Sequence, residues 1–157
     1  MKGDQNLELR AVTMAEREVK RLLPILRLSD WSFCGVVVRD RNKMKLGGEH
    51  KLASISYTMG DQAFLVKLNR EYLNQFGTAL VKRLVAHELA HLVLAPLLEA
   101  FEETVSRYAG VPIPESGDEP GWVQGFLSAL EFAAESIANA VTGKLPVKTT
   151  QRYLDAE

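Results

Sequence analysis

The chain has little cysteine and histidine and almost no net charge. Its 157 residues include a single cysteine, Cys34, so no internal disulfide can form. Only three histidines are present, and 19 Lys and Arg against 20 Asp and Glu leave a net charge of -1. The basic residues are dispersed along the sequence. These absences exclude a disulfide scaffold and give no electrostatic reason to expect a nucleic acid or an acidic membrane surface as partner.

The sequence also lacks a signal peptide and a membrane-length apolar run. Residues 1–10 are polar, without the apolar core that a signal peptide needs. No uninterrupted apolar run reaches the roughly 20 residues of a membrane span. We therefore expect a cytoplasmic protein with one domain over residues 1–157, of which 144–157 form a loosely attached tail.

Against this background one stretch carries recognisable chemistry, namely His87-Glu88-Leu89-Ala90-His91. Side chains four apart on a helix lie on the same face, so His87 and His91 can offer their imidazoles to one ion. Glu88 follows the first of them. There its carboxylate can reach a metal-activated water without binding the metal, which is the position of a general base.

The pattern around this stretch predicts an α+β fold with a small mixed sheet of about three strands. The helix of His87 should begin at an N-cap, Thr78, and stop or kink at Pro96. A tight turn is expected at Gly60-Asp61. The other expected elements are helices at 11–28, 97–108 and 122–141, strands at 31–39, 52–59 and 62–68, and loops at 40–51 and 111–121.

A catalytic zinc normally has three protein ligands and one open position, so two histidines do not complete a site. The remaining histidine, His50, lies in a glycine-rich loop, which favours a carboxylate as third ligand. Glu131 is preferred because it projects from an apolar face of the last helix, where binding a cation would offset the cost of burial. Glu135, one turn along, could accept a hydrogen bond from a ligand imidazole. The open alternatives for the third ligand are Glu135 itself and Glu99, Glu102 and Glu103.

With these residues the chain resembles the zincins, and within them small gluzincin-like metallopeptidases, including ImmA/IrrE-type and phage-type domains. The motif is HELAH at 87–91, and Glu131-Phe-Ala-Ala-Glu135 is similar in form to the pattern of their glutamate helix. The resemblance covers roughly residues 31–141. It implies that the sheet packs on the HExxH helix and on a C-terminal glutamate helix.

The resemblance also implies a function. The protein would be a zinc-dependent hydrolase of peptide bonds, with His87, His91 and Glu131 as ligands of Zn²⁺ and Glu88 as general base. Its partner would be a protein or peptide substrate, which in zincins pairs with the strand before the HExxH helix, here residues 62–68. The chain departs from metzincins, because Leu94 and Leu97 stand where those proteins have Gly and a third His. Candidates to stabilise an oxyanion, by residue type alone, are Tyr72 and Tyr108.

Three other interpretations stay open. A zincin-fold binding protein with little or no activity would dock a partner peptide on an edge strand without cutting it. A deformylase-like enzyme would use Cys34 as third ligand, but Cys34 lies in an apolar strand without the deformylase motifs, which favours a buried structural cysteine. A metal-free helical protein would carry the motif by chance.

Overall fold

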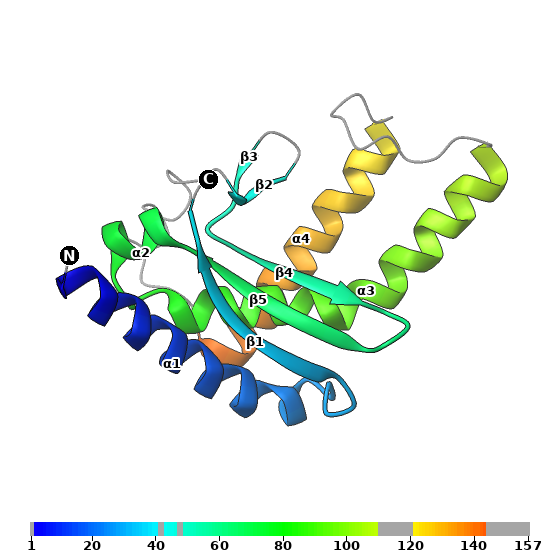
Figure 1. Cartoon of the computed structure of the whole chain (residues 1–157). Helices are drawn as coiled ribbons and strands as arrows, with labels where there is room; N and C mark the ends of the chain where they lie inside the picture. Colours follow the sequence, from blue (N-terminus) through cyan, green and yellow to red (C-terminus); the bar gives the residue numbers. More distant parts are fainter. Residues whose placement is uncertain (1, 41–42, 47–48, 110–120, 144–157) are drawn as a thin grey trace.

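The core of the protein is a three-stranded mixed sheet that packs on helices (Figure 1). A computed structural model describes residues 2–40, 43–46, 49–109 and 121–143. The predicted α+β class is confirmed. Within the described residues the elements, in chain order, are α1 Lys2–Ile25, β1 Ser32–Arg39, β2 Lys45–Leu46, β3 Glu49–His50, β4 Ala53–Thr58, β5 Ala63–Asn69, α2 Arg70–Phe76, α3 Val81–Ala109 and α4 Gly121–Thr142.

The strand order in the sheet is β1-β5-β4. β5 runs parallel to β1 and antiparallel to β4, to which it is joined by the predicted turn at Gly60-Asp61, where the Gln62 amide donates to the Met59 carbonyl over 3.2 Å. The expectation that residues 62–68 offer a free edge to substrate is wrong. β5 is the central strand, with both edges paired, and β4 is the edge strand that contacts α3.

The first helix is longer than its apolar pattern predicts. Ala11, Ala15, Val19 and Leu22 recur at helical spacing and are fully buried, so they hold α1 against the core. The helix nevertheless begins at Lys2 rather than at residue 11, because polar residues can extend a helix that is already anchored. Pro24 lies in its last turn, near the predicted end.

The helix of the histidine motif does not stop at Pro96. α3 continues to Ala109, and the separate helix expected over 97–108 is its second half. A proline removes one backbone donor, a cost that neighbouring contacts can offset. Here Phe101 stacks on Phe126 of α4, with ring centroids 3.7 Å apart. At the other end α3 begins at Val81 rather than after Thr78, whose carbonyl accepts from the Val81 amide over 3.3 Å.

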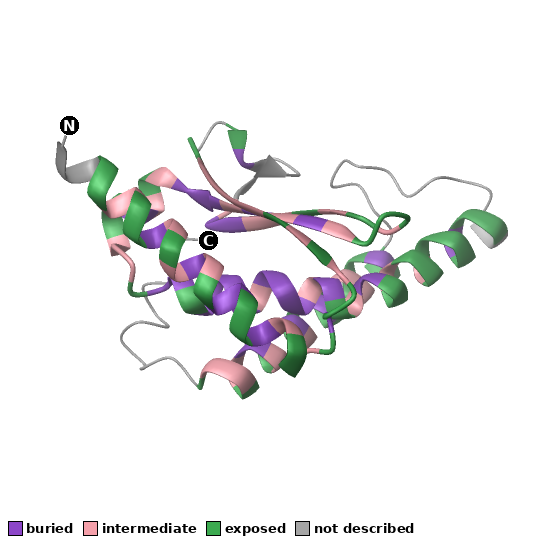
Figure 2. Cartoon of the chain, turned by 60° about the horizontal axis from the view of Figure 1, so that its bottom comes forward, coloured by how far each residue is buried: buried purple, intermediate pink, exposed green. Residues whose placement is uncertain are grey.

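Helices α3 and α4 lie side by side and run in opposite directions (Figure 1). α3 is buried where it passes beneath the sheet and exposed in its second half (Figure 2). By length and hydropathy its residues Val81–Arg107 could also cross a membrane, a weak indication because buried core helices pass the same test. α4 ends at Thr142, and the following residue, Gly143, has a φ of 81°, which favours glycine.

One expected loop contains regular structure. The stretch 40–51 contains a short antiparallel pair, β2 and β3, where the sequence analysis expects only a loop. The expected loop at 111–121 and the tail at 144–157 lie outside the described residues, apart from Gly121, which begins α4.

Phe64 is expected to be a main support of this core. It is 1% exposed on β5, with its ring centroid 5.3 Å from that of Phe33 and 6.4 Å from that of Trp31. Phe64→Ala should lower the free energy of unfolding by about 3–5 kcal/mol, through lost burial and a cavity. Denaturant titration measures the change. The matched control, Phe132→Ala on the 76% exposed Phe132, should stay within about 0.5 kcal/mol, and equal losses would contradict this packing.

Candidate metal centre

His87 and His91 lie one turn apart on the face of α3 that meets α4. Their Nε2 atoms are 3.1 Å apart, and their rings meet edge to face with centroids 4.8 Å apart. Both side chains are partly buried, with 13% of His87 and 26% of His91 exposed. The helical spacing therefore turns two nitrogen atoms toward one point at the edge of the core.

Helix α4 brings Glu131 to the same point. Its carboxylate oxygens lie 3.3 Å from Nε2 of His87 and 3.7 Å from Nε2 of His91, and the three ligand atoms are all within 4.8 Å of one another. Ligands of a tetrahedral zinc at about 2.0–2.1 Å are separated by roughly 3.3–3.5 Å. The spacing of the three groups therefore fits a zinc ion between them.

The tautomer of His87 follows from a second carboxylate. Its Nδ1 lies 3.3 Å from Oε2 of Glu135, and an ionised carboxylate only accepts hydrogen bonds, so Nδ1 carries a proton. In the neutral ring Nε2 then presents a lone pair to Glu131. That arrangement is unfavourable unless a cation, either a second proton or a metal ion, lies between them. The expectation that Glu135 supports a ligand imidazole agrees with this geometry.

The pKa values of His87, His91 and Glu131 are shifted by burial and by the neighbouring charged groups. Burial alone would lower the pKa of His87, but its hydrogen bond to Glu131 and the charges of Glu88, Glu131 and Glu135 outweigh burial and raise it. Burial lowers the pKa of His91, which favours its neutral, metal-binding form. The hydrogen bond from His87 lowers the pKa of Glu131, so this acid is held as a carboxylate.

Arg83 is a buried residue of the site that the sequence analysis missed. It is 4% exposed and forms an ion pair with Glu135, and it also donates to the Glu135 carbonyl over 3.3 Å and to Thr142 Oγ1 over 3.2 Å. It thereby fixes the carboxylate that orients His87. The available signal was its place four residues before His87, which puts a cation on the same face of an apolar helix.

Glu88 lies beneath the edge strand. It is 9% exposed, and burial raises its pKa from 4.5 to about 7. Its carboxylate accepts a hydrogen bond from the backbone amide of Ile55 on β4. A carboxyl group with a pKa near neutrality can both take up and release a proton, as a general base requires.

Lys51 is the second residue that the sequence analysis missed. Its positive charge acts on Glu88, His91 and Glu131, in each case toward a lower pKa. Its backbone is fixed just before β4, because its amide donates to Met44 over 3.2 Å and its carbonyl accepts from Asn69 Nδ2 over 3.0 Å. No sequence pattern pointed to it, since it lies outside the helices that carry the motif.

The expected burial of the third ligand is wrong. Leu130, Ala134 and Ala138 of α4 are buried as predicted, but 57% of the Glu131 side chain is exposed. The apolar face turns toward the core, and Glu131 lies at its border. The case for Glu131 as a ligand therefore depends on its position against the two imidazoles and not on a cost of burial.

The other carboxylates proposed as third ligands lie elsewhere along α3. Glu103 forms an ion pair with Arg107, and the charges of Glu102 and Glu99 act on Tyr57 of β4, whose pKa is raised mainly by burial. In the described part of the chain, the cluster of possible metal ligands contains only His87, His91 and Glu131. The structure therefore brings Glu131, and behind it Glu135, to the histidines.

Cys34 and Tyr72, the remaining candidates whose side chains the structure describes, are not part of this cluster. Cys34 is exposed on β1, which corrects the expectation of a buried structural cysteine and gives no support to a thiolate ligand. Cys34 is the extra residue where the register of β1 against β5 shifts between Phe33 and Gly35, a bulge that the apolar pattern of the strand does not reveal. Tyr72 stacks on Phe76 of α2, with ring centroids 6.1 Å apart. The side chains of Tyr108 and His50 lie outside the described residues.

Comparison with known proteins finds no match for the chain among family models, curated proteins or solved structures.

The buried state of Glu88 predicts a pH-dependent stability in the metal-free protein. Because the folded state raises this pKa from 4.5 to about 7, the Glu88 contribution is fully present below pH 4.5 and is lost as the pH rises through 7. The free energy of unfolding should therefore fall, relative to that of Glu88→Gln, by up to about 3 kcal/mol. Denaturant titration of both proteins in chelator across this range measures the difference. A difference independent of pH would contradict the burial of an ionisable Glu88.

The contact between Glu135 and His87 predicts a change in metal affinity. Glu135→Gln removes the charge that holds the Nδ1 proton of His87 and the charge that pairs with Arg83, so zinc should bind roughly 10–100-fold more weakly. Competition with a chromophoric chelator measures the dissociation constant. Glu99→Gln, on an exposed glutamate of α3, is the control and should bind zinc as the unaltered protein does. Unchanged affinity in Glu135→Gln would contradict the supporting role.

Proposed function

We propose that the protein is a zinc-dependent metallopeptidase, similar to the zincins, that hydrolyses peptide bonds. The observation that carries the proposal is the meeting of His87, His91 and Glu131 from two helices, with the buried Glu88 next to them. Three ligands from the protein leave a fourth position open, which distinguishes catalytic zinc sites from structural ones.

The chain's own groups have distinct roles in this proposal. Zinc, when bound, supplies a Lewis acid that polarises a carbonyl and lowers the pKa of water. Glu88 takes the proton from the attacking water and delivers it to the leaving amine, steps that suit its pKa of about 7. Glu135 and Arg83 hold the ring of His87 in place. Lys51 contributes positive charge where an oxyanion would develop.

The outer edge of β4 is the proposed place for the substrate. The amide of Asn69 donates to Leu52, next to the register pair Ala53 and Leu68, so Ala53 is not hydrogen-bonded to its partner. Because such pairs alternate with bonded ones along an antiparallel ladder, the same holds for Ile55 opposite Val66. The amides and carbonyls of Ala53, Ile55 and Tyr57 therefore face away from β5. Ala53 is 3% exposed and the Ile55 amide already donates to Glu88, so the groups left for an extended peptide are the carbonyl of Ile55 and the amide and carbonyl of Tyr57.

This open edge also supports the alternative function, a zincin-like protein that binds a partner peptide on β4 without cutting it. Strand addition needs only the edge and no general base. The burial of Glu88 favours the enzyme, because a buried carboxyl group costs stability that a binding edge would not require. The two functions share the metal and differ in the use of Glu88.

The deciding experiment is Glu88→Gln in zinc-loaded protein. We expect the variant to bind one zinc ion per chain as before and to lose peptide hydrolysis by about 10²–10⁴-fold, because proton transfer loses its base. Mass spectrometry of a synthetic peptide library measures cleavage, and elemental analysis measures zinc. The control is Glu103→Gln, on an exposed glutamate of α3 that pairs with Arg107, which should cleave at the original rate.

Three outcomes separate the interpretations. If Glu88→Gln cleaves at the original rate, Glu88 is not the base. If the unaltered protein binds zinc but cleaves no peptide, while a library peptide binds it, the alternative holds. If neither the unaltered protein nor Glu88→Gln holds zinc after dialysis against a zinc-containing buffer and removal of the free zinc, both metal-dependent functions fail.

A further inference from the structure

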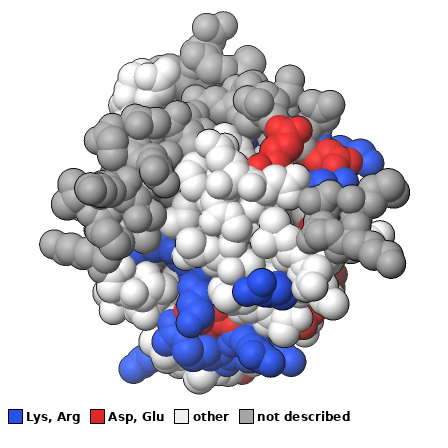
Figure 3. Space-filling view, turned by 90° about the vertical axis from the view of Figure 1, so that its left-hand side faces the viewer, with Lys and Arg blue, Asp and Glu red and all other residues white. Residues whose placement is uncertain are grey.

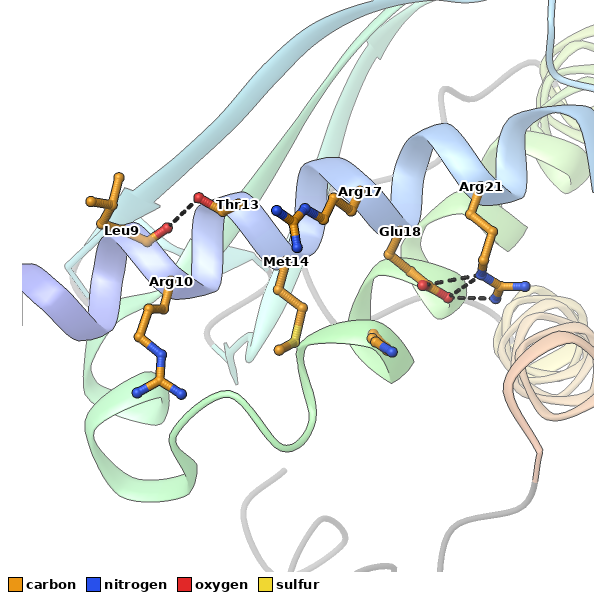
Figure 4. Close-up of a pocket in the computed structure, with 8 residues that line it drawn as sticks. Leu9, Arg10, Thr13, Met14, Arg17, Glu18 and Arg21 are labelled. Atoms are coloured by element: carbon orange, nitrogen blue, oxygen red, sulfur yellow. Dashed lines mark hydrogen bonds and ion pairs between the residues drawn. The ribbon is translucent and has the colours of Figure 1, made fainter.

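A groove along α1 lies away from the metal centre and gives a peptide substrate nothing to pair with. Its wall comes almost wholly from this one helix, and Leu9 and Met14 lie on opposite sides of it (Figure 4). From the left-hand side of Figure 1, Lys and Arg side chains are seen to gather below a patch without charged residues (Figure 3). The backbone groups of a helix are already bonded within it, so an extended chain adds to the edge of β4 and not here.

The edge of β4 also decides where the side chains of an added peptide point. A substrate residue that pairs with Tyr57 in an antiparallel ladder exchanges both backbone hydrogen bonds with it. Directly paired residues turn their side chains to the same face of the sheet. The side chain of Tyr57 lies on the face that packs on the core and on α3. The side chain of the paired substrate residue therefore points to the helical layer as well.

Two glutamates of α3 lie at this place. Glu99 and Glu102 follow Glu88 by eleven and fourteen residues, about three and four turns, so they share the side of α3 that faces β4. Burial raises the pKa of Tyr57, and the charges of Glu102 and Glu99 raise it further. Both carboxylates are therefore within electrostatic reach of the Tyr57 end of the edge.

No ion pair holds Glu99 or Glu102 within the described part of the chain. Both are exposed, and the neighbouring Glu103 pairs with Arg107 instead. Lys51 precedes β4 and brings positive charge to the other end of the strand, where it acts on Glu88. The charge along this edge therefore changes from positive at the start of β4 to negative near Tyr57.

We propose that Glu99 and Glu102 select substrates that carry a lysine or arginine at the position paired with Tyr57. This inference rests on the proposed function, since it concerns the peptide that β4 receives. The apolar stem of the basic side chain packs beside the Tyr57 ring, while its charged head reaches the two carboxylates. An acidic side chain at the same position is repelled by them.

The selected residue lies close to the cleaved bond. Tyr57 is two residues beyond Ile55, whose amide donates to the proposed base Glu88, and strand residues are about 3.3 Å apart. A peptide with its basic residue opposite Tyr57 therefore places the next few peptide bonds beside Glu88 and the histidines. Glu99 and Glu102 thus determine specificity without contacting the reacting atoms.

The test measures binding to Glu88→Gln in zinc-containing buffer, where bound peptides stay uncut. Three fluorescein-labelled pools of random peptides, each about eight residues long, carry Lys, Gln or Glu at one fixed central position. Fluorescence anisotropy measures the affinity of each pool. We expect the Lys pool to bind about fivefold more tightly than the Gln pool, because two exposed carboxylates each contribute modestly. The Glu pool should bind most weakly, and added salt should reduce these differences.

Variants assign this preference to the two glutamates. Adding Glu99→Gln and Glu102→Gln together should make the three pools bind equally. Glu103→Lys is the matched control, because it changes the net charge of the same helix by as much as the two Gln substitutions do, and it should keep the preference for Lys. Glu99→Lys with Glu102→Lys should bind the Glu pool best, a reversal that a merely structural role would not produce.

The outcomes separate this inference from the proposed function. Equal binding of the three pools, a preference that survives Glu99→Gln with Glu102→Gln, or the same loss in Glu103→Lys would overturn the inference. Cleavage by the unaltered protein is scored independently. If it cuts library peptides without enrichment of Lys or Arg near the cut, the inference fails and the proposed function stands. If it cuts none while the Lys pool is preferred, the proposed function fails and the selection by Glu99 and Glu102 stands.

Discussion

The packing of α3 against α4 is the contact on which the candidate site depends. One turn of α3 presents His87 and His91, and one turn of α4 presents Glu131 and Glu135. Of the three candidate ligands, α3 offers two and α4 offers one. Arg83 joins the helices directly, because its guanidinium binds the side chain and the carbonyl of Glu135 and reaches Thr142 at the end of α4. Arg83 is buried, whereas Glu135 is 40% exposed, so this ion pair chiefly fixes geometry and adds a modest amount of stability.

The candidate site carries an excess of negative charge. Glu88, Glu131 and Glu135 bring three carboxylates near one imidazole pair, and the positive groups of Arg83 and Lys51 offset only part of them. The excess of negative charge raises the pKa of His87 and, with burial, contributes to that of Glu88. A divalent cation among these groups would relieve the same repulsion, which is why the arrangement suits a metal ion.

Local patterns were sufficient for part of this structure. The four-residue spacing of His87 and His91, and that of Glu131 and Glu135, depends only on helix geometry, and the sequence shows it directly. Features that depend on packing between elements could not be predicted from these local patterns. The continuation of α3 through Pro96 depends on aromatic contacts with α4, and the exposure of Glu131 depends on how α4 rotates against the core. Strand order is set by packing as well, so the periodicity of residues 62–68 could not reveal that β5 is central.

The position of β4 links the sheet to the chemistry. Because β5 pairs on both sides, the edge nearest α3 falls to β4, and the alternation of the ladder turns the Ile55 amide outward. That amide donates to Glu88. One backbone group therefore belongs to the edge where a peptide could add and also holds the carboxyl group proposed as base. A peptide paired with Tyr57 would lie next to this point, so register along β4 would decide which of its carbonyls lies beside Glu88 and the histidines.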